Sequence, residues 1–241
     1  GVTPRRTRFI QYGGRVPAGV TGVRGLVASL EALAASPFDG VVLDLGTPGI
    51  WGGSIDPAAH GAVVQLLRDA PSPKLRESFH RLASTRAIDW FDPAVVAAVA
   101  RNAGAIAALA RSAGLRGLLL DPQTYGPPAW HVQPTHAGRP FGDLEAAVTR
   151  AGDAIMAAIL EAWPDVVVML VFGQSEPFRA SCVFGEPLAM SRYAVWPAFV
   201  AGLERARIAR GRSASLVDGF LPAYPTRDPA VFPLYRALVA A

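Results

Sequence analysis

The sequence is poor in cysteine and in charged residues. Its 241 residues include one cysteine, Cys182, which excludes a disulfide framework, a cysteine-rich zinc module and a cysteine-ligated iron–sulfur cluster. Charged residues make up 17% of the chain and hydrophobic residues 51%, a balance that excludes intrinsic disorder. No run of about 18 apolar residues and no signal peptide is recognisable, so the sequence predicts no membrane span.

Lysine is almost absent. Of the 23 basic residues only Lys74 is a lysine, and the formal net charge is +4. The arginines gather at residues 5–8 and 205–212, and no aromatic residue separates those of the second group. A nucleic-acid site usually combines a basic patch with a recognisable module. We therefore interpret these arginines as solvated and predict no nucleic-acid partner.

Motifs of common cofactor and metal sites are missing as well. The sequence contains no G-x-x-x-x-G-K-[ST], no H-x-H, no H-E-x-x-H and no G-x-S-x-G. Its glycine-rich segment 13–19 lacks the spacing of a dinucleotide-binding turn and contains a proline. The sequence thus predicts neither a cofactor nor a metal.

Apolar strands alternate with helices along the chain. The patterns predict strands at 8–12, 40–45, 78–83, 116–121, 165–172 and 215–220, and helices at 23–35, 57–69, 93–113, 143–163 and 191–210. Several strands are continuous apolar runs, which is typical of a parallel sheet buried on both faces. Together they predict one α/β domain over residues 1–241.

A (β/α)8 TIM barrel is favoured over a doubly wound sheet, because polar residues cluster just after the strands. Six strands are recognisable rather than eight, and residues 229–241 are predicted to begin another helix. The barrel is therefore complete with two unrecognised strands, incomplete, or continued beyond Ala241. The oligomeric state stays open.

In such a barrel, the chemistry lies at the C-terminal ends of the strands. The polar and aromatic residues at these ends are Gln11, Tyr12, Asp44, Trp51, His80, Arg81, Asp121, Gln123, Tyr125, Trp130, Gln174, Asp218 and Tyr224. Carboxylates, amides and aromatic rings together suit a hydroxylated, partly apolar ligand such as a sugar. His80 and Arg81 are neighbours in one strand, so their side chains are expected on opposite faces of the sheet. One then points into the barrel and the other toward the helices, and His80 is favoured as the residue that lines the pocket.

Each of these residues also has a structural interpretation. Asp44 and Asp121 suit the caps of the turns that follow their strands, and Asp218 suits a turn as well. Trp51 and Trp130 are either platforms for a ligand or lids over the core.

Three further residues after the strands are less promising. Glu176 is expected to be a solvated loop acid, and His131 and His136, in a proline-rich loop, are expected to be exposed.

Several segments, in order over most of the chain, resemble one family. They are RFIQYG at 8–13, SPFDGVV at 36–42, IDWFD at 88–92, AGLRGL at 113–118 with Asp121 and Tyr125, WPD at 163–165 with Phe172-Gly173, and VDGF at 217–220. These resemble a group of uncharacterised bacterial barrel proteins described as glycoside-hydrolase-like. The resemblance implies a barrel fold, hydrolysis or binding of a glycan, and a secreted or periplasmic location.

The sequence departs from that family at two positions. The resemblance implies glutamates two residues after Asp121 and directly after the D-G-F segment, where this chain has Gln123 and Leu221. Glycoside hydrolysis normally needs two carboxyl groups across the scissile bond. Gln123 cannot protonate a leaving group, and Leu221 can be neither base nor nucleophile.

Three hypotheses follow. The first is a glycoside-hydrolase-like enzyme with Asp121 as the acid and Asp218 or Asp44 as the base or nucleophile. In it, sugar rings stack on Tyr12, Trp51, Tyr125 and Trp130, and the hydroxyls are held by Gln11, Gln123 and Gln174. The alternative is a glycan-binding barrel that has lost its catalytic glutamates, a pseudoenzyme. The third is a barrel enzyme of another class, with a small acidic substrate held by Arg81.

Overall fold

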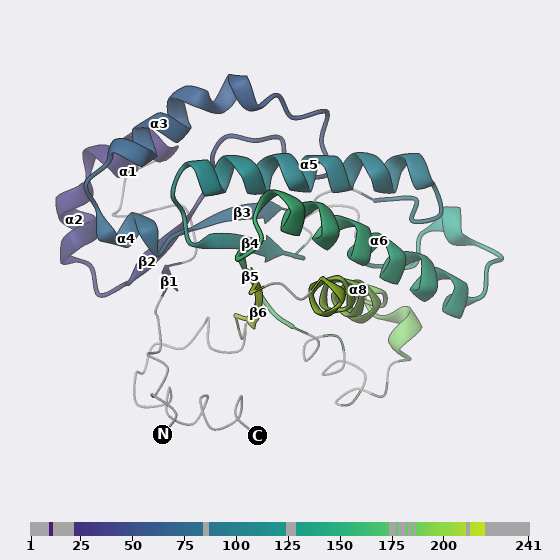
Figure 1. Ribbon diagram of the computed structural model, residues 1–241. Coiled ribbons are helices and arrows are strands. Elements are labelled where there is room, and N and C mark those ends of the chain that lie inside the picture. Colours follow the sequence, from purple (N-terminus) through teal and green to yellow (C-terminus); the bar gives the residue numbers. More distant parts are fainter. Residues whose placement is uncertain are drawn as a thin grey trace.

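Six parallel strands form one sheet in the order of the sequence (Figure 1). The computed structural model describes residues 10–11, 22–83, 87–123, 129–173, 177, 182, 185, 187–210 and 213–219. The strands are β1 (Ile10–Gln11), β2 (Gly40–Leu43), β3 (Phe79–Ala83), β4 (Gly117–Asp121), β5 (Val167–Leu170) and β6 (Ser215–Asp218). The sheet curls into a half-barrel, which confirms the α/β class and is compatible with part of a TIM-like barrel.

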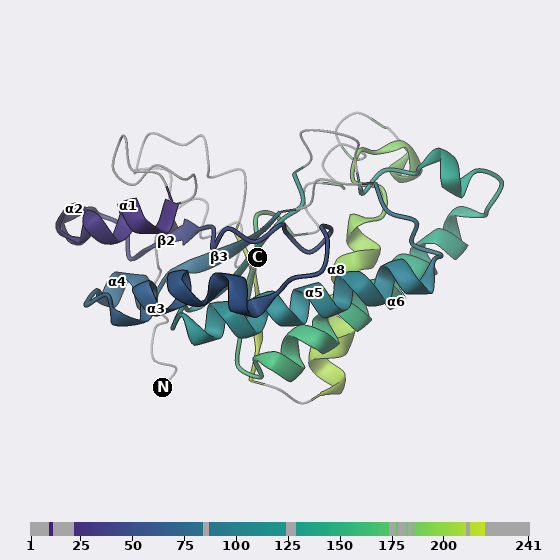
Figure 2. The same ribbon diagram turned by 90° about the horizontal axis from the view of Figure 1, so that it is seen from above.

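Helices connect successive strands and cover one side of the sheet (Figures 1 and 2). The α-helices are α1 (Gly22–Ala28), α2 (Leu30–Ala35), α3 (Gly61–Asp69), α4 (Pro73–Arg76), α5 (Pro93–Ser112), α6 (Phe141–Ala162) and α8 (Trp196–Ala209). Three 3-10 turns are η1 (Pro57–His60), η2 (Pro134–His136) and η3 (Leu188–Met190). Helical crossovers of this kind are how parallel neighbours are joined.

Helix α5 follows its predicted signals. The Asp92 carboxylate accepts the backbone N–H groups of Ala94 and Val95 at 2.8 and 3.3 Å, and a proline occupies the first turn. Gly114, with φ of 72°, ends the helix in a conformation that favours glycine. Of the described helices, α5 alone is long and apolar enough by composition to cross a membrane, yet half of that stretch is buried inside this fold.

Three helices differ from the predicted ranges. The predicted helix 23–35 is interrupted at Ser29, and the predicted helix 57–69 begins with the turn η1. Helix α8 begins at Trp196 rather than at residue 191, so that Pro197 falls in the first turn, where its missing N–H costs no intrahelical bond. The short helix α4 was not predicted, because four residues are too few for a periodic pattern.

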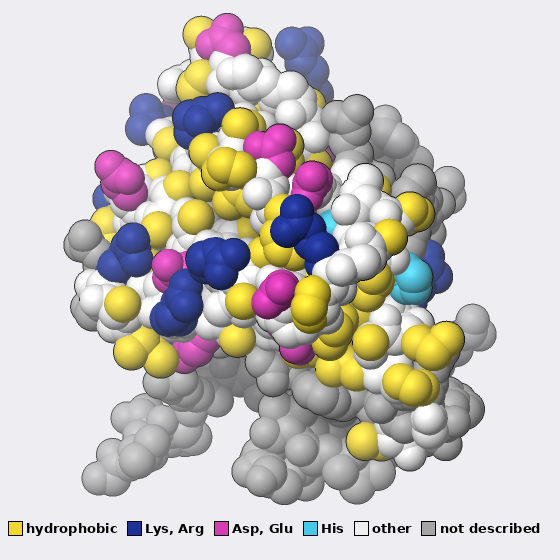
Figure 3. Space-filling model, turned by 90° about the vertical axis from the view of Figure 1, so that its right-hand side faces the viewer, with side chains coloured by type: hydrophobic (Ala, Val, Ile, Leu, Met, Phe, Trp, Pro, Cys, Tyr) yellow, Lys and Arg dark blue, Asp and Glu magenta, His cyan; other side chains and the backbone are white. Residues whose placement is uncertain are grey.

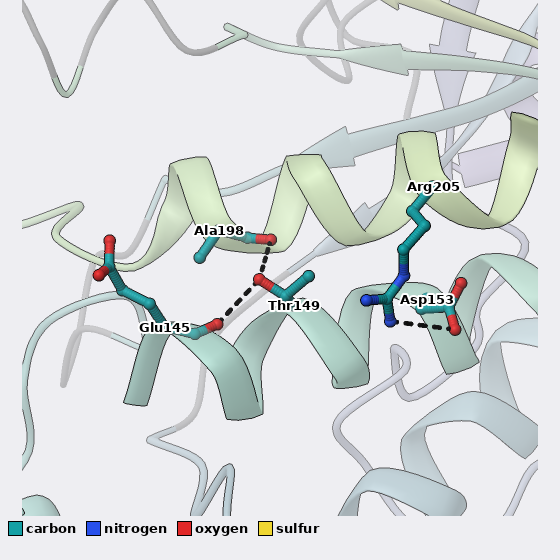
Figure 4. A network of polar contacts seen from close by, with 5 residues as sticks. All are labelled: Glu145, Thr149, Asp153, Ala198 and Arg205. Atoms are coloured by element: carbon teal, nitrogen blue, oxygen red, sulfur yellow. Dashed lines mark hydrogen bonds and ion pairs between the residues drawn. The ribbon is translucent and has the colours of Figure 1, made fainter. Parts of the chain in front are cut away.

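Helices α6 and α8 pack closely through two glycines. A Cβ at Gly152 would collide with the backbone of Phe199, and a Cβ at Gly202 with the backbone of Thr149. The Thr149 hydroxyl donates to the carbonyl of Glu145 and lies 3.1 Å from that of Ala198, beside the Arg205–Asp153 ion pair (Figure 4). Helix α6 connects β4 to β5, and α8 connects β5 to β6.

The arginine-rich end of α8 is balanced by acidic side chains. Arg205 lies 3.3 Å from Asp153, and the Arg207 Nε donates to Glu204 at 2.7 Å. Figure 3 shows cationic and anionic side chains interspersed over the face on the α6 and α8 side. A mixed surface of this kind agrees with the interpretation of this arginine group as solvated.

The two sides of β5 differ in exposure. In β5, Val168 and Leu170 are buried, whereas Val167 and Met169 are only partly buried. Side chains alternate along a strand, so the first pair faces the helices and the second faces the concave side. We call these the helix side and the concave side. In β2 and β4 the residues of both sides are buried.

Candidate functional site

The predicted site residues that the structure describes lie at one edge of the sheet. Gln11, Asp121 and Asp218 are the last residues of β1, β4 and β6, Asp44 follows β2 directly, and Arg81 lies within β3. Because all six strands are parallel, these positions approach the same edge (Figure 1). The predicted site residues Tyr12, Tyr125, Gln174 and Tyr224, and the loop acid Glu176, lie outside the described residues.

An ion pair joins Arg81 on β3 to Asp121 on the neighbouring strand β4. The Arg81 Nη2 lies 3.4 Å from the Asp121 Oδ2, and the two side chains are 37% and 0% exposed. Asp121 Oδ1 accepts the backbone N–H of Gln123 at 3.0 Å. Arg81 pairs with Leu119 in register, so Arg81, Leu119 and Asp121 share the side of Met169, the concave side.

The Arg81 side chain has donor capacity left over. Its Nε is buried and has no hydrogen-bond partner in the part of the chain that the structure describes. The 3.4 Å distance to Asp121 exceeds the 2.7–2.9 Å or so of a tight charge-assisted hydrogen bond. The carboxylate therefore positions the guanidinium without engaging all of its donors.

Asp44 caps a turn and is exposed. Its Oδ1 accepts the backbone N–H of Gly46 at 2.8 Å, and Gly46 has a φ of 77°. The turn-capping interpretation of Asp44 is thus confirmed. Asp44 lies one residue beyond Leu43, the last paired residue of β2, and its carboxylate acts electrostatically on His80.

Asp218 lies on the other side of the sheet. It pairs in register with Leu170, which pairs with Leu120, the residue before Asp121. Side chains of successive residues point to opposite faces, so Asp121 and Asp218 are directed to different sides of the sheet. Asp218 is exposed and lies against Gly173, where an added Cβ would collide with its carboxylate.

His80 is fully buried on the helix side. Its Nδ1 accepts the N–H of Leu45 at 3.3 Å, and its Nε2 lies 3.3 Å from the Thr47 hydroxyl. With Nδ1 as the acceptor, Nε2 carries the proton and donates to Thr47. His80 therefore fastens the loop after β2. The expectation of opposite faces for His80 and Arg81 is confirmed, but the residue on the concave side is Arg81 and not, as expected, His80.

The electrostatics of His80 match this role. Burial lowers the pKa of His80 from 6.5 to about 4, because the charged imidazolium loses its hydration. The Asp44 carboxylate and the Leu43 carbonyl oppose this effect, and His60 adds slightly to it. At neutral pH the ring is uncharged.

The two tryptophans predicted as ligand platforms lie in a buried aromatic cluster. Trp51 is 6% exposed and Trp130 is fully buried. The Trp130 ring contacts Trp90, Trp196 and Phe199 at centroid distances of 5.6, 4.7 and 4.9 Å, and Trp51 at 6.0 Å. With these contacts the rings offer a ligand almost no exposed surface, and the structure assigns them the alternative role of lids over the core.

The burial of His136 differs from the expectation. It was expected to be exposed, but it is 2% exposed, and its Nδ1 accepts the N–H of Gln133 at 3.1 Å. Burial lowers the pKa of His136, with opposing effects from Asp89 and the Ile88 carbonyl. The side chain packs edge-on against Phe91, at 5.9 Å between centroids. A proline-rich composition gave no signal of this burial, since such segments are usually at the surface.

Two predicted glutamines, Gln11 and Gln123, remain. Gln11 and Gln123 are partly buried, and Gln123 binds Asp121 through its backbone N–H. Among the described residues, no group of three or more histidines, cysteines or acids is placed to hold a metal ion.

A scan against protein-family models and searches of the curated proteins and of the solved structures found no match. The resemblance to glycoside-hydrolase-like barrels therefore stays a prediction. The α/β fold with its parallel half-barrel sheet is what the structure establishes.

Proposed function

We propose that this chain binds a carbohydrate on the concave side of its sheet, at the C-terminal edge, and does not hydrolyse it. The observation that carries the proposal is the Arg81–Asp121 pair, a half-exposed donor fixed by a buried acceptor beside Gln123. Planar groups that combine donors and acceptors suit the hydroxyls of a sugar, each of which both donates and accepts.

The arrangement of the carboxylates supports binding over hydrolysis. The register directs Asp121 and Asp218 to different sides of the sheet, whereas hydrolysis needs two carboxyl groups facing each other across one bond. Both contacts of Asp121 described above use it as an acceptor, from Arg81 and from the N–H of Gln123. A general acid must instead donate a proton to the leaving oxygen.

The test is equilibrium binding to a panel of immobilised glycans, with two matched aspartate variants. Asp121→Asn removes the charge that fixes Arg81 and is expected to weaken binding about tenfold or more, in line with the loss of a charged hydrogen bond. Asp218→Asn, on the other side of the sheet, is the control and is expected to bind as the wild type does. Equal losses in both variants, or no glycan bound at all, would contradict the proposal.

A further inference from the structure

Residues 131–140, between β4 and α6, are anchored by one buried side chain. The segment contains the turn η2, and of its ten residues His136 alone is buried, with 2% of its surface exposed. The others are partly or fully exposed. Segments with few buried contacts open locally at a free energy below that of global unfolding. The burial of His136 therefore decides whether this segment is closed against the fold or open.

The closed segment covers the side chain of Phe91, which follows β3. His136 packs against the edge of the Phe91 ring, at 5.9 Å between centroids, and the Arg139 guanidinium lies over its face, 4.1 Å from the centroid. The backbone N–H of Phe91 donates to the Asp89 carboxylate at 3.0 Å, and the next residue, Asp92, is the N-cap of α5. The segment therefore closes against a turn that is itself fixed by side-chain caps.

The hydrogen bonding of His136 requires a neutral ring. Its Nδ1 accepts the backbone N–H of Gln133 at 3.1 Å, so the proton of the neutral ring is on Nε2. Nε2 is buried and has no hydrogen-bond partner among the described residues. A second proton, on Nδ1, turns the acceptor into a donor that faces the Gln133 N–H, and it also buries a positive charge. Both effects disfavour the closed segment.

We propose that residues 131–140 form a strap that is closed at neutral pH and opens on acidification, with His136 as its pH-sensitive anchor. The proposal goes beyond the proposed function and does not depend on it, because the strap is held by its own side chains. Opening transfers His136 to water, where the charged ring is hydrated. It also uncovers the edge and the face of the Phe91 ring.

The electrostatic environment of His136 gives the direction of the effect. Burial acts most strongly and lowers the pKa of His136 from its ordinary value of 6.5. The Asp89 carboxylate and the Ile88 carbonyl, from the segment after β3, oppose this effect, and the Arg139 guanidinium, on the strap, adds to it. A group with a lowered pKa in the closed form takes up its proton on opening. The closed form therefore keeps its full stability above pH 6.5 and loses stability as the pH falls below 6.5.

The experiment is amide hydrogen exchange of the full chain between pH 7.5 and 5, measured by NMR and corrected for the intrinsic exchange rate at each pH. The N–H groups of Gln133 and Ala137 are hydrogen bonded in the closed strap. Their protection is expected to fall below pH 6.5, by at most about tenfold per pH unit, the limit for an opening that takes up one proton. The N–H groups of α6 report global unfolding and are the reference for this loss.

Three variants identify the group that is responsible. His136→Asn keeps an acceptor but takes up no proton, so the protection of its strap is expected to be independent of pH. His131→Asn replaces a partly exposed histidine of the same strap and is the matched control, which is expected to keep the pH dependence of the wild type. Arg139→Gln loses the contact with the face of Phe91 and is expected to lower the protection at every pH while the pH dependence stays.

Parallel pH profiles of the wild type and of His136→Asn would overturn the proposal. A loss of protection in α6 as large as that in the strap would also overturn it, because the whole fold would then be opening. If the strap of His136→Asn is open at every pH, the NMR titration of the His136 ring in the wild type decides. A ring that titrates below pH 6.5 supports its role as the anchor, and a ring that titrates at or above pH 6.5 contradicts it.

Discussion

Acidification is expected to destabilise this fold through His80. Folding keeps the ring uncharged, because burial lowers its pKa from 6.5 to about 4. In the unfolded chain the ring takes up a proton near pH 6.5, whereas in the folded chain it does so only near pH 4. The stability that depends on the neutral ring is therefore complete above pH 6.5 and is lost as the pH falls from 6.5 to 4.

The magnitude follows from the same two values. The interval between 6.5 and about 4 corresponds to about 3 kcal/mol of unfolding free energy, at about 1.4 kcal/mol for each tenfold change. His80 is fully buried, so solvent does not screen this effect. A domain is usually stable by about 5–15 kcal/mol, which makes the loss a large fraction of the total.

Structurally, protonation reverses the role of Nδ1. A proton there prevents it from accepting the N–H of Leu45, and the new donor can only face the Leu43 carbonyl, 3.3 Å away. The loop that begins at Asp44 then loses one of its two hydrogen bonds to His80, while the bond between Nε2 and Thr47 persists. Urea denaturation followed by far-UV circular dichroism, between pH 7.5 and 4, measures the loss in the wild type.

The comparison with His80→Asn isolates this residue. Asparagine offers an acceptor near the place of Nδ1 but takes up no proton, so the variant is expected to lose about 3 kcal/mol less than the wild type over the same pH range. The shared titration of carboxylates and of His136 cancels in the difference. Parallel pH profiles of the two proteins would refute the reasoning, as would a histidine NMR signal assigned to His80 that titrates near pH 6.5.

Three further perturbations test the packing. Lys74→Met removes an ammonium that donates to the carbonyls of Leu33, Ala34 and Ser36 at the end of α2, and is expected to cost about 1–3 kcal/mol in urea denaturation. Gly152→Ala forces α6 away from the backbone of α8 and is expected to cost about 1–3 kcal/mol and lower the melting temperature, whereas Gly142→Ala, with open space around it, serves as its control. Trp130→Ala empties the centre of the aromatic cluster and is expected to cost about 3–5 kcal/mol by the same assay, and a variant as stable as the wild type would contradict the packing role.

The local signals in the sequence were sufficient for the order of the elements. An aspartate, a proline and a terminal glycine delimit α5, because caps act within a few residues of one another. Continuous apolar runs likewise indicated β4, which is buried on both faces, and β5, which is fully buried on one. Alternation along one strand was also enough to expect His80 and Arg81 on opposite faces.

The relative placement of residues on different strands could not be predicted from such local signals. Whether Asp121 and Asp218 share a side depends on the register of β4, β5 and β6, which long-range pairing determines. The role of Trp51 and Trp130 could not be predicted either, since the sequence around a loop tryptophan does not show whether its ring contacts a ligand or other aromatic rings. The turns capped by Asp44 and Asp121 were the exceptions, because an aspartate that accepts the backbone N–H two residues further on is itself a local signal.

The most direct test of the account is a time course of ligand-observed saturation-transfer NMR with oligosaccharides from the glycan panel and the full chain. The account predicts saturation of sugar protons with the wild type and with Asp218→Asn, strong loss of saturation with Asp121→Asn, and no new anomeric signals over days. Absence of saturation with the wild type, or anomeric signals of released sugar that depend on Asp121, would contradict the claim that this edge of the sheet holds a sugar without cleaving it.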